Sequence, residues 1–275
     1  MGINDWRYYN HAVIPSTGPH DEPDISCIKN KSIWKLNGGG VPFIARWTTD
    51  FDCGYETSWW YVVKDTPFDI NTLKAKRRYE INKGKKNFQV KRINPTDYAE
   101  QLFNVLKCAL ESWPEKYRPI VSKDTFYKEL SGWKEYLVYG GFDNNGLLCG
   151  FAYLKEYTSY LDFCVLRVNP QRERDGINAA MVFGILQDNN ERLGKSFYIC
   201  DGSRSIRHET AFQNYLEKYF GFRKAYCKLH IIYRFPLNLV VKVLYPFRKK
   251  ISSENKIGSL LSSILRMEEY HRECE

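Results

Sequence analysis

The sequence lacks the features that usually indicate export, metal binding or membrane insertion. None of its eight cysteines forms a C-x-x-C pair, and no H-x-x-x-H companion accompanies them. No apolar run approaches the length of a membrane-spanning helix, and the first ten residues lack the apolar core of a secretion signal. We therefore expect a cytoplasmic protein with free thiols and no bound metal.

Acidic residues are scarce in one stretch of the chain. Residues 74–92 contain nine Lys and Arg side chains against Glu80 alone, an excess close to the +9 net charge of all 275 residues. Such a concentration predicts a surface that meets an anionic partner, such as tRNA or another polyanion. The residues expected to contact it are Arg77, Arg78, Lys83, Lys85 and Lys86.

Hydrophobic residues make up 43% of the chain and aromatic residues 16%, which predicts a folded globular protein. The pattern of strands and helices suggests three parts. Residues 1–65 form an extension of short strands and loops, either a partial first lobe or a lid. Residues 66–235 form a catalytic domain, and residues 236–275 form a basic and apolar helical segment.

Residues 157–194 predict a strand, a polar loop and a helix. The strand, at 160–168, is rich in β-branched and aromatic residues, and the helix repeats apolar residues at helical spacing. Between them, Arg172 and Arg174 precede a helix start, where unpaired N–H groups and the helix dipole attract anions. Gly176 would let a pyrophosphate approach the backbone. An ordinary strand-to-helix connection with solvated charges is the alternative.

The remaining pattern predicts eleven further elements after residue 56. A strand at 57–64 and a helix from Ile70 to about Gly84 or Asn87 precede a strand at 88–93. A strand at 196–201 should run parallel to the strand at 160–168, because the helix between them makes a crossover. The others are helices at 95–113, 122–132 and 211–220, strands at 135–142, 147–157 and 222–233, and a helix at 259–272.

The order from residue 88 to 233, β-α-α-β-β-β-α-β-α-β, resembles that of the GNAT superfamily of acyltransferases. Val168-x-Pro170 with Arg174-Asp175-Gly176-Ile177-x-Ala179 resembles its acyl-CoA loop, and Phe220-Gly221-Phe222 resembles the Gly-Phe that closes its last helix. Glu173 stands where the family usually has Arg or Gln. The resemblance implies an α+β, GNAT-like fold: a mixed, mostly antiparallel sheet with helices on both faces, here with an N-terminal extension. It also implies acyl-CoA as cofactor, bound by Leu166, Val168, Arg172, Arg174, Asp175, Gly176, Ile177, Asn178 and Ala179.

A second resemblance covers the basic stretch. Residues 77–86, R-R-Y-E-I-N-K-G-K-K, resemble the R-x-x-I-x-K-A-x-K segment of the FemAB-like branch. That branch shares the GNAT fold and can use aminoacyl-tRNA as donor, so the resemblance implies a tRNA partner.

Acyl transfer to an amine or hydroxyl needs a general base with a pKa near neutrality. The polar stretch at 201–210, D-G-S-R-S-I-R-H-E-T, offers His208 first, because its ordinary pKa is already near neutral, and Asp201 second. A helix-capping loop with a solvated His208 is the alternative. The resemblance to the GNAT superfamily implies a tyrosine acid that protonates the leaving group a few residues before the closing Gly-Phe, and Tyr215 and Tyr219 are the candidates next to that place. The side chains expected to bind the acceptor are Arg204, Arg207 and Trp60.

Three functions fit these patterns. The first is acyl transfer from acyl-CoA to an amine or hydroxyl, on a sugar, peptide or cell-envelope precursor. The second is a FemAB-like transfer from aminoacyl-tRNA. The third is a non-catalytic protein that binds nucleic acid or a membrane surface, since the basic and apolar residues 237–250 could lie on an anionic bilayer.

Overall fold

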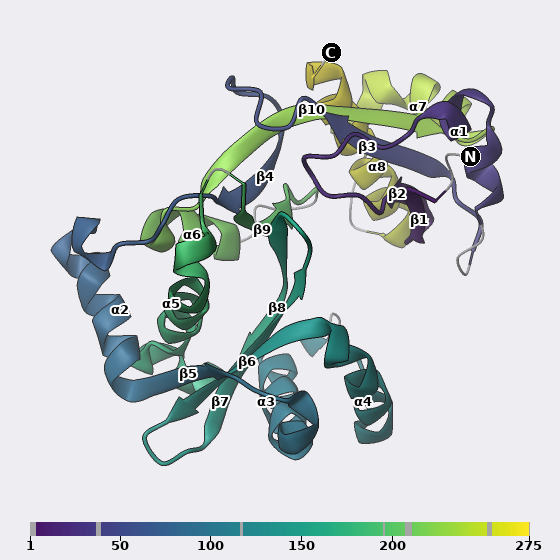
Figure 1. Ribbon diagram of the computed structural model, residues 1–275. Helices are drawn as coiled ribbons and strands as arrows, with labels where there is room; N and C mark the ends of the chain where they lie inside the picture. The colour runs from purple at the N-terminus through teal and green to yellow at the C-terminus, as the bar shows by residue number, and fades with distance from the viewer. Residues whose placement is uncertain are drawn as a thin grey trace. The chain divides into compact units, whose positions relative to one another are not determined.

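The computed structural model describes residues 4–36, 40–115, 118–194, 196–206, 211–251 and 255–274 (Figure 1). Its chain falls into two compact units. The first unit combines Met1–Val62, Ser203–Ala211 and Lys224–Glu275, and the second combines Val63–Gly202 and Phe212–Arg223. The N-terminal and C-terminal segments thus belong to the same unit. The division at residues 65 and 235 stays a prediction.

The first unit contains a sheet with the strand order β1-β2-β3-β10. Strand β3 pairs parallel with β2 and antiparallel with β10, and helix α8 packs on β10 through Met267 and Tyr270 against Cys227 and Leu229. Its elements are β1 (Trp6–Tyr9), β2 (Ala12–Pro15), α1 (Ser26–Lys29), the 3-10 helix η1 (Ser32–Lys35), β3 (Ile44–Thr49), β10 (Arg223–Tyr233), α7 (Leu237–Leu244), the 3-10 helix η8 (Tyr245–Lys250) and α8 (Lys256–Cys274).

The second unit has the strand order β9-β8-β7-β6-β5, with every pairing antiparallel except β8 with β9. Strand β4 (Trp59–Lys64) begins in the first unit and ends in the second. The elements of the second unit are the 3-10 helix η2 (Ile70–Thr72), α2 (Ala75–Asn87), β5 (Phe88–Arg92), η3 (Pro95–Tyr98), α3 (Ala99–Glu111), α4 (Lys123–Leu130), η5 (Ser131–Glu135), β6 (Tyr136–Asp143), β7 (Leu148–Glu156), β8 (Tyr160–Val168), η6 (Pro170–Asp175), α5 (Ile177–Asn189), η7 (Asn190–Arg192), β9 (Tyr198–Ser203) and α6 (Ala211–Phe220). The predicted order after residue 88 is confirmed.

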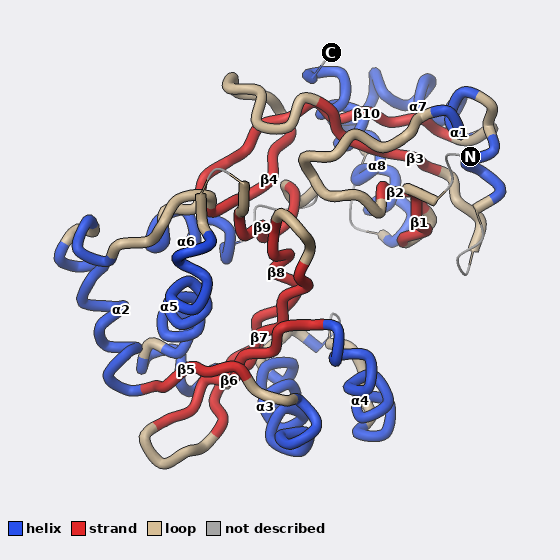
Figure 2. Tube along the Cα trace, viewed as in Figure 1, coloured by secondary structure: helices blue, strands red, loops and turns tan. Residues whose placement is uncertain are grey.

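Helices cover both faces of the sheet of the second unit, as predicted. Successive residues of a strand point to opposite faces. On β6, Gly141 faces α5, because a Cβ there would meet Met181, whereas Phe142 packs with Leu102 and Val105 of α3. Figure 2 shows α2 and α5 on one side of these strands and α3 and α4 on the other. The α+β class and the mostly antiparallel sheet are therefore confirmed.

Two expected elements differ from the structure. The predicted helix from Ile70 is interrupted, because Asp69 caps only the short η2, and α2 starts afresh at Ala75. The predicted face of the helix at 95–113 does not extend to Trp113, since α3 ends at Glu111 and Trp113 lies beyond it with 39% of its surface exposed.

Helix α2 packs on the start of α5 at a contact between two glycines. Gly84 was expected to help end the helix, but it lies in the interior of α2, where an added Cβ would come within 2.5 Å of the Gly176 carbonyl oxygen. Gly176 has φ +91°, and its own Cβ would lie 2.9 Å from the Gly84 backbone. The Asn87 amide then donates to the Asp175 carbonyl at 3.0 Å. Only glycine at both positions permits this approach.

We predict that Gly84→Ala destabilises the protein, although alanine normally stabilises a helix interior by about 1 kcal/mol relative to glycine. The clash is with backbone, so the helices must separate, at a cost of about 1–3 kcal/mol. Urea unfolding followed by far-UV circular dichroism measures the change.

Gly132→Ala is the matched control, because no atom lies within 4 Å of a Cβ at that position. It should leave the free energy of unfolding nearly unchanged. An unfolding free energy of Gly84→Ala at or above that of the unmodified protein would show that the two helices do not meet as described.

Candidate active site

Strands β8 and β9 run parallel for three residues and then separate. Their pairing joins Tyr160 to Tyr198, Leu161 to Ile199 and Asp162 to Cys200, and no later pair is formed between these strands. Beyond Asp162, β8 stays bonded to β7 on its other edge as far as Val168. The predicted parallel pairing is confirmed, and beyond Asp162 the edge of β8 that faces away from β7 is open to a ligand.

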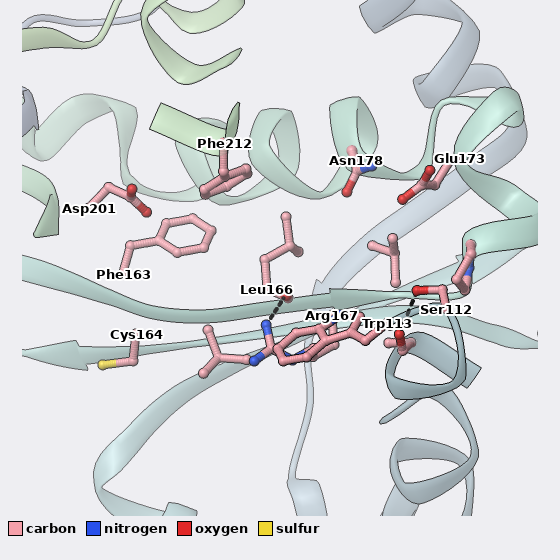
Figure 3. Close-up of a pocket in the computed structure, with 14 residues that line it drawn as sticks. Ser112, Trp113, Phe163, Cys164, Leu166, Arg167, Glu173, Asn178, Asp201 and Phe212 are labelled. Atoms are coloured by element: carbon pink, nitrogen blue, oxygen red, sulfur yellow. Dashed lines mark hydrogen bonds between the residues drawn. The ribbon is translucent and has the colours of Figure 1, made fainter. Parts of the chain in front are cut away.

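A β-bulge lies where the strands separate. Val165 pairs with Tyr153 and Phe163 pairs with Leu154, so Cys164 has no partner across the pair. A bulge of this kind shifts the alternation of side chains by one residue. In Figure 3, Phe163 and Leu166 accordingly point to one side of β8, and Cys164 and Arg167 point to the other.

A pocket of about 330 Å³ surrounds this open edge. It draws its walls from the end of α3, from β8, from the start of α5, from the end of β9 and from α6, all within the second unit. The residues that line it are Ala109, Ser112, Trp113, Phe163, Cys164, Val165, Leu166, Arg167, Val168, Pro170, Glu173, Asn178, Asp201 and Phe212.

Asp201 is the titratable group at the β9 end of the pocket. It follows the last paired residue of β9, and in Figure 3 it lies beside Phe163 and Phe212, whose ring centroids are 5.7 Å apart. Burial raises the pKa of Asp201 from 3.8 to about 7; a hydrogen bond from Gln213 acts in the opposite direction, and the Asp162 carboxylate adds to the rise. A carboxyl group with this pKa can accept and return a proton at neutral pH.

Arg167 supplies a cation on the opposite side of β8. Its guanidinium lies 5.5 Å from the centre of the Trp113 ring and donates to the Leu166 carbonyl at 2.9 Å. Burial lowers the pKa of Arg167, yet an arginine remains charged at neutral pH. No carboxylate of the described residues forms a salt bridge with it. A carboxylate or phosphate of a ligand would therefore meet a desolvated cation with most of its donors available.

The start of α5 does not form the predicted pyrophosphate cradle. The Gly176 amide donates to the Glu173 carbonyl at 3.0 Å, and Gly176 itself is buried against Gly84. Arg172 lies 3.4 Å from carboxylate oxygens of both Asp143 and Asp175, so its charge is already balanced. These contacts correct the roles assigned to Gly176, Arg172 and Asp175.

The other residues assigned to the loop are divided between the pocket and the core. Leu166, Val168 and Asn178 line the pocket. Ile177 and Ala179 are buried in the core, and Arg174 is exposed. Glu173 brings a carboxylate to this end of the pocket, where a pyrophosphate would need positive charge.

The predicted acids are not part of the pocket. Tyr215 and Tyr219 contact each other, with ring centroids 4.9 Å apart, and only their neighbour Phe212 lines the pocket. Burial raises the pKa of Tyr215, and Tyr219 and Glu80 add to the rise. Within the described residues neither tyrosine lines the pocket, so their assignment as leaving-group acids stays a prediction without support from its geometry.

The predicted acceptor contacts belong to the first unit. Arg204 donates to the Ser58 carbonyl at 2.6 Å, and its guanidinium lies 4.2 Å from the Trp60 ring and 3.9 Å from the Tyr270 ring. The Lys224 ammonium group lies 4.4 Å from the centre of the Trp60 ring. Arg204 and Trp60 thus contact each other and do not line the pocket, and their assignment to an acceptor stays a prediction. His208 and Arg207 lie outside the described residues.

The basic stretch forms a separate surface on α2. Arg78 donates to the Asn71 carbonyl and Lys85 lies 4.5 Å from the Phe183 ring, while Arg77 is half-buried. The side chains at helical spacing on the outer face are Lys76, Tyr79, Lys83 and Lys86. Tyr79 is 64% exposed, so this face combines three cations with an accessible aromatic ring.

Sequence reasoning missed Arg167, Trp113, Phe163 and Phe212. A signal existed for Arg167, because it is a charged residue inside an otherwise apolar strand. Trp113 had none, since its place depends on where α3 ends, and the pairing that produces the bulge at Cys164 cannot be read from local sequence.

No family model and no curated protein matches the chain. Among solved structures, FemX superimposes with a TM-score of 0.54 at 10% identity, over 87% of this chain and 85% of FemX. L-PGS from Bacillus licheniformis superimposes with a TM-score of 0.52 at 13% identity, over 89% of this chain and 84% of L-PGS. The C-terminal domain of a candidate lysylphosphatidylglycerol synthetase from Agrobacterium fabrum superimposes with a TM-score of 0.51 at 13% sequence identity. The match covers 87% of this chain and 84% of that domain. At these identities the comparison establishes a shared fold.

We predict that Asp201→Asn becomes more stable relative to the unmodified protein as the pH rises. Because folding raises the pKa of Asp201 to about 7, its contribution to stability is complete below the unfolded value of about 4 and is lost as the pH rises through 7. The difference in melting temperature should therefore widen between pH 4 and pH 8.

Asp188→Asn is the control with the opposite sign. Burial of Asp188 opposes ionisation, but hydrogen bonds from Tyr139 and Arg92 lower its pKa overall. That variant should lose stability at neutral pH, and the loss should shrink as the pH falls. A pH-independent difference for Asp201→Asn would contradict the raised pKa.

Proposed function

We propose that the protein transfers an aminoacyl group from aminoacyl-tRNA to an amine or hydroxyl of a phosphate- or carboxylate-bearing acceptor. The observation that carries the proposal is the pocket at the open edge of β8, with Asp201 on one side and Arg167 on the other. The shared fold with FemX and with lysylphosphatidylglycerol synthetases, whose name describes a lysyl group joined to a phospholipid, supports this class of reaction.

The donor is inferred from charge. Acyl-CoA needs a site for its pyrophosphate, whereas at the start of α5 the Gly176 amide is bonded, Arg172 is paired and Glu173 adds negative charge. The outer face of α2 instead offers Lys76, Lys83 and Lys86, which suit the repeated phosphates of an RNA backbone. The resemblance of residues 77–86 to the FemAB-like branch points to the same donor.

The proposed reaction needs two proton transfers, one from the acceptor to Asp201 and one to the ribose oxygen that leaves. Asp201 accepts the proton as the acceptor's nitrogen or oxygen attacks the carbonyl carbon of the aminoacyl ester. The carbon–oxygen bond to the terminal ribose then breaks, and the ribose oxygen takes up a proton. A backbone N–H of the open edge, expected at residues 166–168, would stabilise the carbonyl oxygen as it becomes negative.

Arg167 would hold the acceptor. A guanidinium binds a phosphate or carboxylate with two parallel hydrogen bonds, and Trp113 covers its face and limits hydration. The separation of Asp201 and Arg167 on opposite sides of β8 lets the acceptor's anionic group and its nucleophile occupy different parts of the pocket.

Transfer of a labelled amino acid from total aminoacyl-tRNA to an envelope-lipid and precursor extract tests the reaction. We expect Asp201→Asn to lower the rate about a hundredfold or more and to remove an apparent pKa near 7 from the pH–rate profile. Arg167→Lys should mainly raise the KM for the acceptor. A protein that transfers nothing from aminoacyl-tRNA but is stabilised by acyl-CoA, in proportion to the logarithm of its concentration, would contradict the proposal.

Binding of tRNA tests the role of α2. Replacing Lys76, Lys83 and Lys86 by Gln should weaken binding and lower the salt slope by roughly one for each lysine. The charge-matched control replaces the exposed Lys107, Lys128 and Lys134 on α3, α4 and η5. Fluorescence polarisation at several salt concentrations measures both. Equal loss in the two variants would mean that only net charge matters and that α2 is not the contact surface.

A further inference from the structure

Helix α7 and the 3-10 helix η8 carry an apolar face that no described residue covers. On the inner face of α7, Val241 is buried, and Leu237 and Leu244 pack against Ile264 and Leu265 of α8. The outer face, which we call the α7 face, is formed by Phe235, Leu239, Val240, Val243 and Phe247, whose exposed fractions range from 38% to 72%. Five large apolar side chains so close in sequence are unusual on a protein surface in contact with water.

Positive charge surrounds the α7 face. Residues 234–251 contain five Lys and Arg residues and no Asp or Glu. Arg248 is committed to Glu269 at 2.8 Å, but Lys242, Lys249 and Lys250 are exposed and form no salt bridge with a described carboxylate. The cations available to a partner therefore flank the apolar side chains.

We propose that the α7 face docks on an anionic phospholipid bilayer, with its apolar side chains among the acyl chains and its lysines at the headgroups. Amphipathic helices with large apolar side chains and flanking Lys or Arg residues lie in the bilayer interface in this way. Within the part of the chain that the structure describes, no helix is long and apolar enough to span a bilayer.

The combination of groups favours a bilayer over two other occupants. A nucleic acid would use the lysines but would leave Phe235, Val243 and Phe247 in water. A second copy of the chain would cover the apolar side chains but would bring the same lysines together, which costs energy by repulsion. Only an anionic lipid surface matches both sets of side chains.

Co-sedimentation with vesicles tests the proposal, using the full chain and either phosphatidylcholine alone or phosphatidylcholine and phosphatidylglycerol in equal parts. We expect binding to the anionic vesicles and little to the neutral ones. Leu239→Glu combined with Val243→Glu should lower the partition coefficient about tenfold or more. Replacing Lys242, Lys249 and Lys250 by Gln should lower it roughly fivefold for each lysine at low salt, without disturbing the packed inner face.

Two controls separate this face from other exposed groups. Leu147→Glu removes a 58% exposed leucine of the second unit, and the Gln variant of Lys76, Lys83 and Lys86 removes an equal charge from α2. Both should bind anionic vesicles as the unmodified protein does. The proposal is overturned if the unmodified protein does not bind anionic vesicles, or if the α7 variants bind as well as these controls. It is also overturned if the α7 face proves to be a dimer interface, with a molar mass that halves in the Leu239 and Val243 variant.

Discussion

The separation of β8 from β9 after only three residue pairs is the feature on which the site depends. If β8 and β9 stayed paired as far as Val168, their backbone N–H and C=O groups would hydrogen-bond to each other, and no free strand edge would remain for a substrate. The bulge at Cys164 coincides with this separation and turns Phe163 and Leu166 to one side of the strand and Arg167 to the other. One irregularity in pairing thus places an acid–base group and a cation on the two sides of one open edge.

The same edge explains why Asp201 titrates near neutrality. Where β9 leaves β8, Asp201 has no partner on β8 and lies beside the rings of Phe163 and Phe212. Desolvation then raises its pKa, and Gln213 keeps the rise within the range in which the carboxylate still forms at neutral pH. Burial of this carboxylate costs stability at neutral pH, and the same burial suits it to the role of base that we propose.

The sequence was sufficient for the order of elements after residue 88 and for the parallel pairing of β8 with β9, because both follow from local periodicity and from the crossover rule for parallel strands. It was insufficient for the roles of single residues. A glycine at position 176 is equally consistent with a backbone that binds a phosphate and with one that packs against a neighbouring helix. Only the observed contact with Gly84 distinguishes the two. Tyr215, Tyr219 and Arg204 were plausible as acids or anchors, but their partners come from distant parts of the chain that local patterns do not reveal.

The contact between Gly84 and Gly176 also bears on the proposed choice of donor, because it closes the start of α5 to a phosphate. A helix start that binds phosphates does so with backbone N–H groups, which are rigid and carry no net charge. Here α2 occupies that place and presents lysine side chains, while Arg167 is the desolvated cation of the pocket. Anions held by exposed side-chain charge are held more weakly as salt rises, because each contact releases counterions. A donor that carries many phosphates compensates for this weakness by the number of its contacts, whereas a single pyrophosphate does not, and this difference favours an RNA-borne acyl group.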